Sequence, residues 1–332
     1  MKEKLEYLLY IAQEIHATDI HFIVQKKQVM ISMRSLHGIQ DIHEDIFDLS
    51  FFNYLKYLGN LDLANHMKPQ SGQFQYIYKG KQLNFRFSLL CTLDMQTGVL
   101  RILNNHHLLQ IQDLTIQKNC ISSFFHWSKF RSGLIILSGP TGSGKSTTLH
   151  AILHTIANNQ KLKVISLEDP IEIHDDSYLQ LQINEKADFT YEEGIRQLLR
   201  HDPDVIMIGE IRDTNTAKMA YRCALTGHMV FSTVHAKNCA EAIKRLMDLG
   251  IAKQDLKDTL TAVSSQRLFQ VNGKEERTCI YEILEKEELE YFMVEGKHET
   301  KHRDIFDEIK IAVEKGFISS QEAECDLGII NE

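Results

Sequence analysis

The sequence predicts an α/β protein in which a larger domain with a mostly parallel sheet follows a smaller α+β domain. Two observations predict the larger domain. An apolar run at 134–137 leads into a glycine-rich loop and then a helical segment, and from residue 121 onward strand-like and helix-like segments alternate. A third observation predicts the smaller domain, because residues 1–103 contain several short β-prone runs beside two helical segments.

Length and composition limit the possible classes of protein. A chain of 332 residues with 43% hydrophobic content suggests roughly two folded domains. The 37 basic and 45 acidic residues give a net charge of −8, which argues against direct nucleic-acid binding. Six scattered cysteines without a CxxC pair predict a reducing compartment, no disulfides and no structural zinc. With no secretory leader and no apolar run near the ~18 residues that span a bilayer, we expect a cytoplasmic protein.

The smaller domain is expected to begin with an amphipathic helix over residues 1–15. Short β-prone runs at 20–24 and 29–33 predict a hairpin, and 51–58 predicts a second helix. The runs at 74–78, 83–90 and 99–103 predict an antiparallel meander. Residues 104–119 are polar and lack a clear period, so we expect an interdomain linker there and a larger domain over 120–332.

The glycine-rich loop after the apolar run has the pattern GxxxxGKS, followed by a predicted helix over 147–156. Glycines allow the backbone N–H groups to curl around phosphate oxygens, the lysine approaches the β- and γ-phosphates, and the serine hydroxyl binds Mg²⁺. An ordinary glycine turn is the alternative, but the strand before it and the helix after it favour a nucleotide site. The predicted binding residues are Gly139, Pro140, Thr141, Gly142, Ser143, Gly144, Lys145, Ser146 and Thr147.

Polar side chains follow three further predicted strands. The run 164–167 ends in Glu168 and Asp169, and 205–208 leads to Glu210. The third run, 229–231, is preceded by His228 and followed by His235. Ligands of open α/β sheets bind at the carboxyl ends of strands, where two carboxylates could hold Mg²⁺ through water and orient an attacking water. A solvated acidic turn is the alternative for each acidic segment taken alone.

These segments together resemble the secretion and type IV pilus assembly ATPases, which are RecA-like ring motors. Residues 139–146 match the Walker A loop of that family, and ISLEDPIE at 165–172 resembles its aspartate box. LRHDPDVIMIGEIRD at 199–213 matches its Walker B segment, and TGHMVFSTVH at 226–235 resembles its histidine box. In the smaller domain, ATDIH at 17–21 and the strands at 85–88 and 99–103 are also similar to the family.

The resemblance implies a RecA-like ATPase domain, a PAS-like amino-terminal domain, and use of ATP with Mg²⁺. It implies that Glu210 organises Mg²⁺ and its waters and that Glu168 positions or deprotonates the attacking water, although the division between these two acids stays open. His235 would sense the γ-phosphate, with His228 as a weaker second candidate. Arg86 and Arg101 occupy the positions of arginines that reach the γ-phosphate in the family.

The resemblance also implies a homo-oligomer, six subunits in the family, working at the cytoplasmic face of the membrane on an inner-membrane platform protein. The chain lacks the tetracysteine zinc motif of many family members, and this short form without zinc is most similar to the competence pseudopilus ATPases of Gram-positive bacteria. We therefore expect a motor that assembles a competence pseudopilus for DNA uptake.

Three other functions remain open at this stage. One is a nucleotide-binding ring scaffold with little turnover, and another is a nucleic-acid translocase, which the acidic composition disfavours. The third is a small-molecule kinase, for which the sequence offers no evident acceptor pocket and which leaves the histidine segment unexplained.

Overall fold

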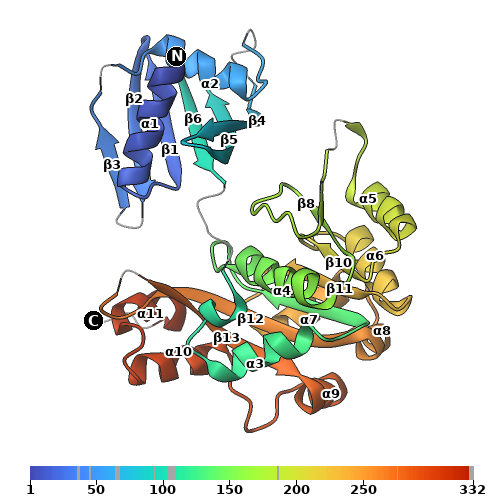
Figure 1. Ribbon diagram of the computed structural model, residues 1–332. Helices are drawn as coiled ribbons and strands as arrows, with labels where there is room; N and C mark the ends of the chain where they lie inside the picture. Colours follow the sequence, from blue (N-terminus) through green and yellow to red (C-terminus); the bar gives the residue numbers. More distant parts are fainter. Residues whose placement is uncertain are drawn as a thin grey trace. The chain divides into compact units, whose positions relative to one another are not determined.

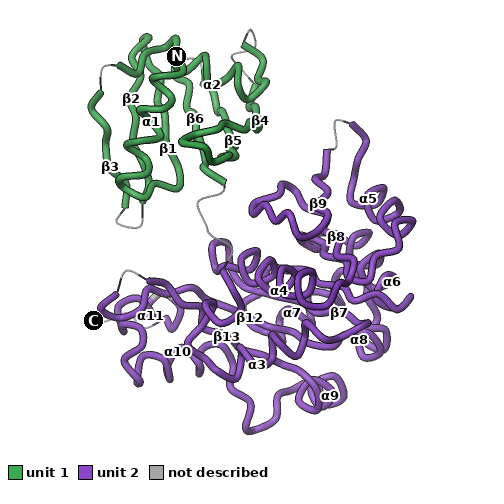
Figure 2. Tube along the Cα trace, viewed as in Figure 1, with its two compact units in different colours: residues 1–107 green, residues 108–332 purple. Residues whose placement is uncertain are grey.

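The computed structural model describes residues 1–332 except 36–37, 45, 64–67, 93, 104–108, 185–186, 275 and 329–332, and except the side chain of Cys325. Its contacts divide the chain into two compact units, Met1–His107 and Leu108–Glu332 (Figure 2). Among the described residues, no helix combines the length and the apolar character that crossing a membrane requires.

The first unit is an antiparallel sheet with two helices. In the described part of this unit the sheet has six strands in the order β3-β2-β1-β6-β5-β4. Its elements, visible in Figure 1, are α1 (Lys2–Glu14), β1 (Asp19–Gln25), β2 (Gln28–Ser35), β3 (Gly38–Ile42), α2 (Leu49–Leu58), β4 (Gln70–Tyr78), β5 (Lys81–Cys91) and β6 (Met95–Ile102). The predicted helices, hairpin and meander are thus confirmed, whereas its PAS-like character stays a prediction.

Leucines at helical spacing explain why α1 packs on the sheet. Its buried residues, Leu5, Leu8, Leu9 and Ala12, form one face of the helix. They share a core with phenylalanines of α2 and with inward-facing residues of the strands, among them Phe22 of β1 and Phe87 of β5. Alternate residues of β1 point to this core, which is the pattern of a sheet covered on one face.

The second unit contains a mainly parallel sheet. The described strands have the order β13-β12-β7-β11-β10-β8-β9, and within this sheet β12 and β13 pair antiparallel while the other neighbours run parallel. The strands are β7 (Gly133–Ser138), β8 (Val164–Glu168), β9 (Leu179–Gln182), β10 (Val205–Ile208), β11 (Met229–Val234), β12 (Leu260–Gln270) and β13 (Arg277–Glu285). The helical elements are η1 (Ile111–Asp113), α3 (Lys118–Trp127), α4 (Lys145–Gln160), α5 (Tyr191–Leu198), η3 (Leu199–His201), α6 (Thr214–Leu225), α7 (Cys239–Asp248), α8 (Lys253–Thr259), α9 (Lys286–Glu295), α10 (Ile305–Glu314) and α11 (Ser320–Leu327).

Helices cover both faces of this sheet, so its central strands are apolar on both sides. On one face α3 and α4 bury residues such as Trp127 and Ile152 against Ile135 of β7. On the other face α5 to α9 bury residues such as Ile243 against Ile136. Buried parallel strands of this kind explain the continuous apolar runs in the sequence.

The predicted linker is too long at its carboxyl-terminal end. Residues 104–108 lie outside the described residues, but Ile111 and Leu114 are buried in the core beneath α3 and α4. Thr115 also donates a hydrogen bond of 2.6 Å from its hydroxyl to the carbonyl oxygen of Cys279 in β13. The polar residues around these anchors hid them, because the segment shows no clear apolar period.

Candidate active site

The loop between β7 and α4 has a conformation that requires glycine. Gly139 has a φ of +145°, and a Cβ atom there would lie 2.6 Å from the carbonyl oxygen of Gln266, so a larger residue would not fit. Gly144 caps α4 in the left-handed conformation with a φ of +87°. The loop therefore curls around the amino terminus of α4, where the helix dipole favours an anion.

Lys145 lies over this loop. Its Nζ donates hydrogen bonds of 2.9 Å to the carbonyl oxygens of both Gly139 and Pro140. Burial lowers the pKa of Lys145, while the carboxylates of Glu210 and Glu172 act in the opposite direction. The lysine thus carries a partly desolvated positive charge at the amino terminus of α4, and Ser146 follows it in the same helical turn. This arrangement suits a phosphate group.

Side chains of β12 and β13 support the phosphate loop and the helix that follows it. The side-chain amide of Gln266 in β12 donates a hydrogen bond of 2.7 Å to the carbonyl oxygen of Ser143. The hydroxyl of Tyr281 in β13 lies 2.7 Å from that of Thr148 in α4. The sequence analysis missed Gln266 and Tyr281 because they lie more than a hundred residues from the loop in the chain, and nothing in their local pattern points to it.

The strand order brings Glu210 and His235 toward the loop. β11 is the direct neighbour of β7, and β10 comes next. His235 follows β11 and Glu210 follows β10, and His235 Nε2 lies 3.3 Å from Glu210 Oε1. The other oxygen of Glu210 accepts a hydrogen bond of 2.8 Å from Nε of Arg212, a residue that the sequence analysis did not select. Lysine, glutamate, histidine and arginine therefore meet at the carboxyl edge of the sheet.

Glu168 lies farther from the loop and is already engaged. β8 is separated from β7 by β11 and β10, which corresponds to about 14 Å at ordinary strand spacing. The carboxylate is buried and accepts hydrogen bonds from Ser166 Oγ at 2.6 Å and from Gln180 Nε2 at 3.1 Å. His150 Nε2, from the second turn of α4, lies 3.3 Å from its other oxygen. This environment holds Glu168 in place beneath α4.

The structure places His228 away from the phosphate loop. This residue precedes β11, at the edge of the sheet opposite to the phosphate loop, since parallel strands all begin at one edge and end at the other. Its Nδ1 lies 3.1 Å from the carbonyl oxygen of Cys223 and 3.1 Å from the hydroxyl of Thr226. His235 therefore lies at the edge of the sheet that carries the phosphate loop. His228 lies at the opposite edge, because the whole of β11 separates the two histidines.

Arg86 and Arg101 belong to the first unit, where they pair across β5 and β6 on one face of the sheet. Arg86 Nε donates a hydrogen bond of 3.3 Å to Ser71 Oγ. Arg101 Nε donates one of 2.7 Å to Asp19 Oδ1, and Asp19 belongs to the ATDIH segment. Both arginines keep exposed side chains, and the role predicted for them stays a prediction.

The glycine-lined loop, the lysine above it and the carboxylate on a neighbouring strand fit a nucleoside triphosphate and a Mg²⁺ ion. The hydroxyl of Ser146 and the carboxylate of Glu210 are oxygen ligands of the type that Mg²⁺ prefers. Together with the parallel sheet and its strand order, these features define a RecA-like P-loop ATPase.

Comparison with known proteins identifies the family. The model of the family described as "Type II/IV secretion system protein" matches residues 2–324, and the chain belongs to this family. The competence protein ComGA of Bacillus subtilis (strain 168) is 32% identical over 300 residues, which cover 85% of this chain and 84% of that relative. The chain is an ATPase of the secretion type.

Two solved structures share the fold. The ATPase DotB of Legionella pneumophila superposes with a TM-score of 0.79 at 22% identity, covering 98% of this chain and 95% of the other. The pilus retraction motor PilT, solved with bound ADP, superposes with a TM-score of 0.79 at 24% identity, covering 97% and 96%. At these identities the likeness concerns the fold alone.

Proposed function

We propose that this chain hydrolyses ATP to power assembly of a competence pseudopilus for DNA uptake. The observation that carries the proposal is the pairing of Glu210 with His235 at the edge of the sheet where the glycine loop and Lys145 lie. The particular system is supported by the similarity to the competence protein of Bacillus subtilis over most of both chains.

In the proposed reaction, the loop amides and Lys145 bind the β- and γ-phosphates, and Ser146 with Glu210 holds Mg²⁺, directly or through water. The metal ion neutralises charge on the phosphates when it is bound. We assign orientation of the attacking water to Glu210 in preference to Glu168, because Glu168 is buried and follows β8, which lies one strand farther from the phosphate loop than β10. His235 then links Glu210 to the occupancy of the γ-phosphate site.

We propose that the two units, Met1–His107 and Leu108–Glu332, act as two domains and that the chain works as a homo-oligomer, with six subunits as in its family. Its place of action would be the cytoplasmic face of the membrane, on a platform protein of the pseudopilus. In this proposal Arg86 and Arg101 contact the γ-phosphate, so that hydrolysis changes the contact between domains. Such a change produces motion only if the two arrangements differ in affinity for nucleotide.

Natural transformation of a cell that carries the gene tests this function. A strain whose only copy encodes Lys145→Ala should lose DNA uptake, whereas a strain encoding Lys129→Ala, which changes an exposed lysine after α3, should keep it. Normal uptake with Lys145→Ala would favour a nucleotide-binding scaffold. Strong stimulation of the purified ATPase by single-stranded DNA at physiological salt would favour a nucleic-acid translocase.

A further inference from the structure

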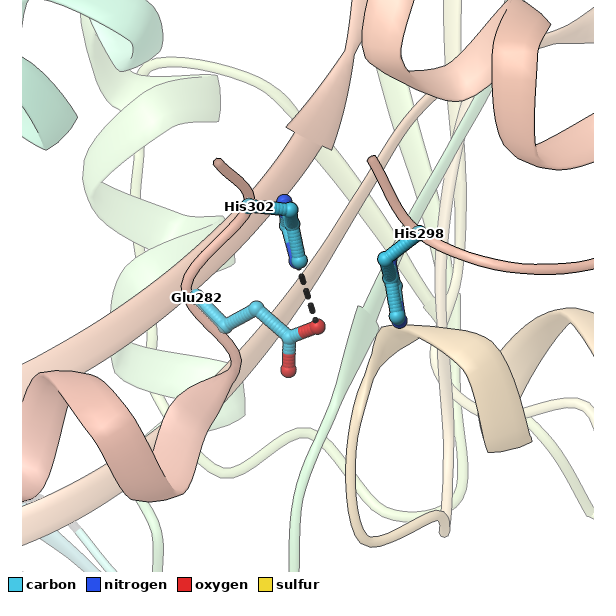
Figure 3. A group of neighbouring side chains, drawn as sticks. All are labelled: Glu282, His298 and His302. Carbon is cyan, nitrogen blue, oxygen red and sulfur yellow. Dashed lines mark hydrogen bonds and ion pairs between the residues drawn. The ribbon is translucent and has the colours of Figure 1, made fainter. Parts of the chain in front are cut away.

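A second cluster of chemically active side chains lies in the carboxyl-terminal part of the chain. Glu282 belongs to β13, and His298 and His302 lie in the segment between α9 and α10 (Figure 3). One potential ligand atom from each of these residues lies within 4.8 Å of the other two. Tyr281, the neighbour of Glu282 in β13, contacts α4, so Glu282 faces the opposite side of the sheet from the phosphate-loop helix.

Glu282 is a buried carboxylate with one oxygen already occupied. Only 1% of the residue is exposed. Its Oε2 accepts hydrogen bonds from the backbone N–H groups of Cys239 at 3.1 Å and Ile305 at 3.3 Å, which are the first residues of α7 and α10. The amino termini of two helices therefore stabilise the charge. The other oxygen, Oε1, faces His302 Nε2 at 3.2 Å.

His302 lies between two carboxylates. Its Nδ1 is 3.1 Å from Glu288 Oε2, and its Nε2 is 3.2 Å from Glu282 Oε1. A neutral imidazole has a single N–H, so one of its nitrogens would direct a lone pair at a carboxylate. A proton or a metal ion is therefore needed between that nitrogen of His302 and the carboxylate that it faces. A histidine that donates one N–H to a carboxylate and offers its other nitrogen to a metal is the usual arrangement of a zinc ligand.

His298 distinguishes between these two possibilities. Its ring stacks on that of His302 with 4.2 Å between centroids and an angle of 8° between planes. Its Nδ1 is buried and has no hydrogen-bond partner among the described residues. A proton on His302 would leave this nitrogen unsatisfied and the His298 ring without a role, whereas a metal ion in the cluster would give the ring a partner.

We propose that Glu282, His298 and His302 bind a zinc ion, with water completing the coordination. Two histidines and a glutamate are an established zinc ligand set, in which a fourth position is left for water. His302 Nε2 and Glu282 Oε1 are 3.2 Å apart, close to the roughly 3.3 Å expected between ligands of tetrahedral zinc, and the three ligand atoms all lie within 4.8 Å of one another.

Cys239 does not compete as a ligand. Its thiol lies 3.8 Å from the backbone carbonyl oxygen of Glu282. Burial raises the pKa of the thiol well above the ordinary value. The thiol therefore stays protonated near neutral pH. This explains why a search for cysteine motifs does not reveal the site. Zinc would connect β13 to the segment before α10 and would stabilise the carboxyl-terminal helices.

The test uses the full chain, freed of any histidine tag and dialysed against a chelator. Zinc chloride is titrated by calorimetry, bound metal is counted by mass spectrometry, and thermal unfolding is followed with and without the ion. We expect about one zinc per chain and a higher Tm with zinc. Millimolar Mg²⁺ should leave the unfolding of a chain without nucleotide unchanged, because imidazole ligands suit zinc better.

Three variants make the assignment specific. His298→Ala removes a ring whose Nδ1 has no partner, so this variant should fold while losing both zinc binding and the rise in Tm. Glu288→Gln should weaken zinc binding about 10- to 100-fold, the usual effect of changing a carboxylate that orients a ligand. His126→Ala, an exposed histidine of α3, should behave like the parent.

Two results would overturn the proposal. One is a parent chain that binds no more zinc than His298→Ala, which would leave a proton as the only cation at His302. The other is a His298→Ala variant that binds zinc with the affinity of the parent.

Discussion

At the scale of single residues, Glu210 connects the charged groups of the active site. It lies 3.3 Å from His235 and accepts a hydrogen bond from Arg212, and it influences the pKa of Lys145. Glu210→Gln should slow phosphate release by at least about 10²-fold, the usual contribution of a positioned acid–base group. ATP binding, followed with a fluorescent nucleotide, should persist because Lys145 and the loop remain.

The control is Glu276→Gln, an exposed glutamate at the turn between β12 and β13. It should hydrolyse ATP at the parent rate. A Glu210→Gln variant with parent turnover would exclude this residue from the reaction.

Glu168 provides a second comparison at the same scale. Its oxygens are held by Ser166, Gln180 and His150, and glutamine can keep part of this network. Glu168→Gln should therefore reduce turnover less than Glu210→Gln does, as measured in the same phosphate-release assay. A loss equal to or greater than that of Glu210→Gln, with ATP binding intact, would instead make Glu168 the group that acts on water.

The residues that the sequence could predict are those that follow a strand directly. Lys145, Glu210 and His235 each follow an apolar run at the edge where ligands bind, so their neighbourhood could be inferred from strand direction. His228 precedes its strand, so the strand direction places it at the other edge of the sheet. Gln266 and Tyr281 reach the site only through tertiary packing, which local patterns do not encode.

At the scale of elements, β12 supports the phosphate loop. Gln266→Leu removes the hydrogen bond to Ser143 and leaves that buried carbonyl oxygen with only the weak thiol donor of Cys279, at 3.6 Å. The free energy of unfolding should fall by about 1–3 kcal/mol. The KM for ATP should rise, because the loop loses the support that shapes it for phosphate. Chemical denaturation and steady-state kinetics measure the two effects.

Gln254→Leu is the matched control, because Gln254 is exposed on α8. Its side-chain amide donates a hydrogen bond to the carboxylate of Asp258, one turn farther along the same helix, and not to the phosphate loop. It should keep the KM of the parent. If Gln266→Leu also kept that KM, β12 would be a packing element without influence on nucleotide binding.

Several elements were predictable from an apolar pattern, but β12 and β13 were not predicted although most of their residues are buried. β10 was predicted to the residue. β3 and β9 were missed because both are edge strands with no buried residue. Their polar, exposed sequences show no alternation to detect.

At the scale of the whole molecule, the arginines of the first unit test whether both units take part in hydrolysis. Arg86→Ala should lower turnover without changing the oligomer mass, because an arginine that contacts the γ-phosphate stabilises the charge of the transition state. Phosphate release and analytical ultracentrifugation provide the two measurements. Arg34→Ala is the matched control, since Arg34 is exposed on β2 of the same sheet.

Turnover equal to the parent in Arg86→Ala would remove the first unit's arginine from the reaction. Loss of the oligomer would instead assign Arg86 to assembly. The sequence alone allowed the prediction of two folding units. It did not decide whether Arg86 acts in hydrolysis or in assembly, because that role depends on contacts between domains and between subunits.

Phosphate release by the purified chain with ATP and Mg²⁺ tests the central claim most directly. Lys145 Nζ lies over the loop, held by the carbonyl oxygens of Gly139 and Pro140, and it is the group we expect to contact the transferred phosphate. We predict that the parent and Lys129→Ala release phosphate at the same rate, and that Lys145→Ala releases none above background while remaining folded by circular dichroism. Equal turnover by Lys145→Ala and the parent would contradict the account.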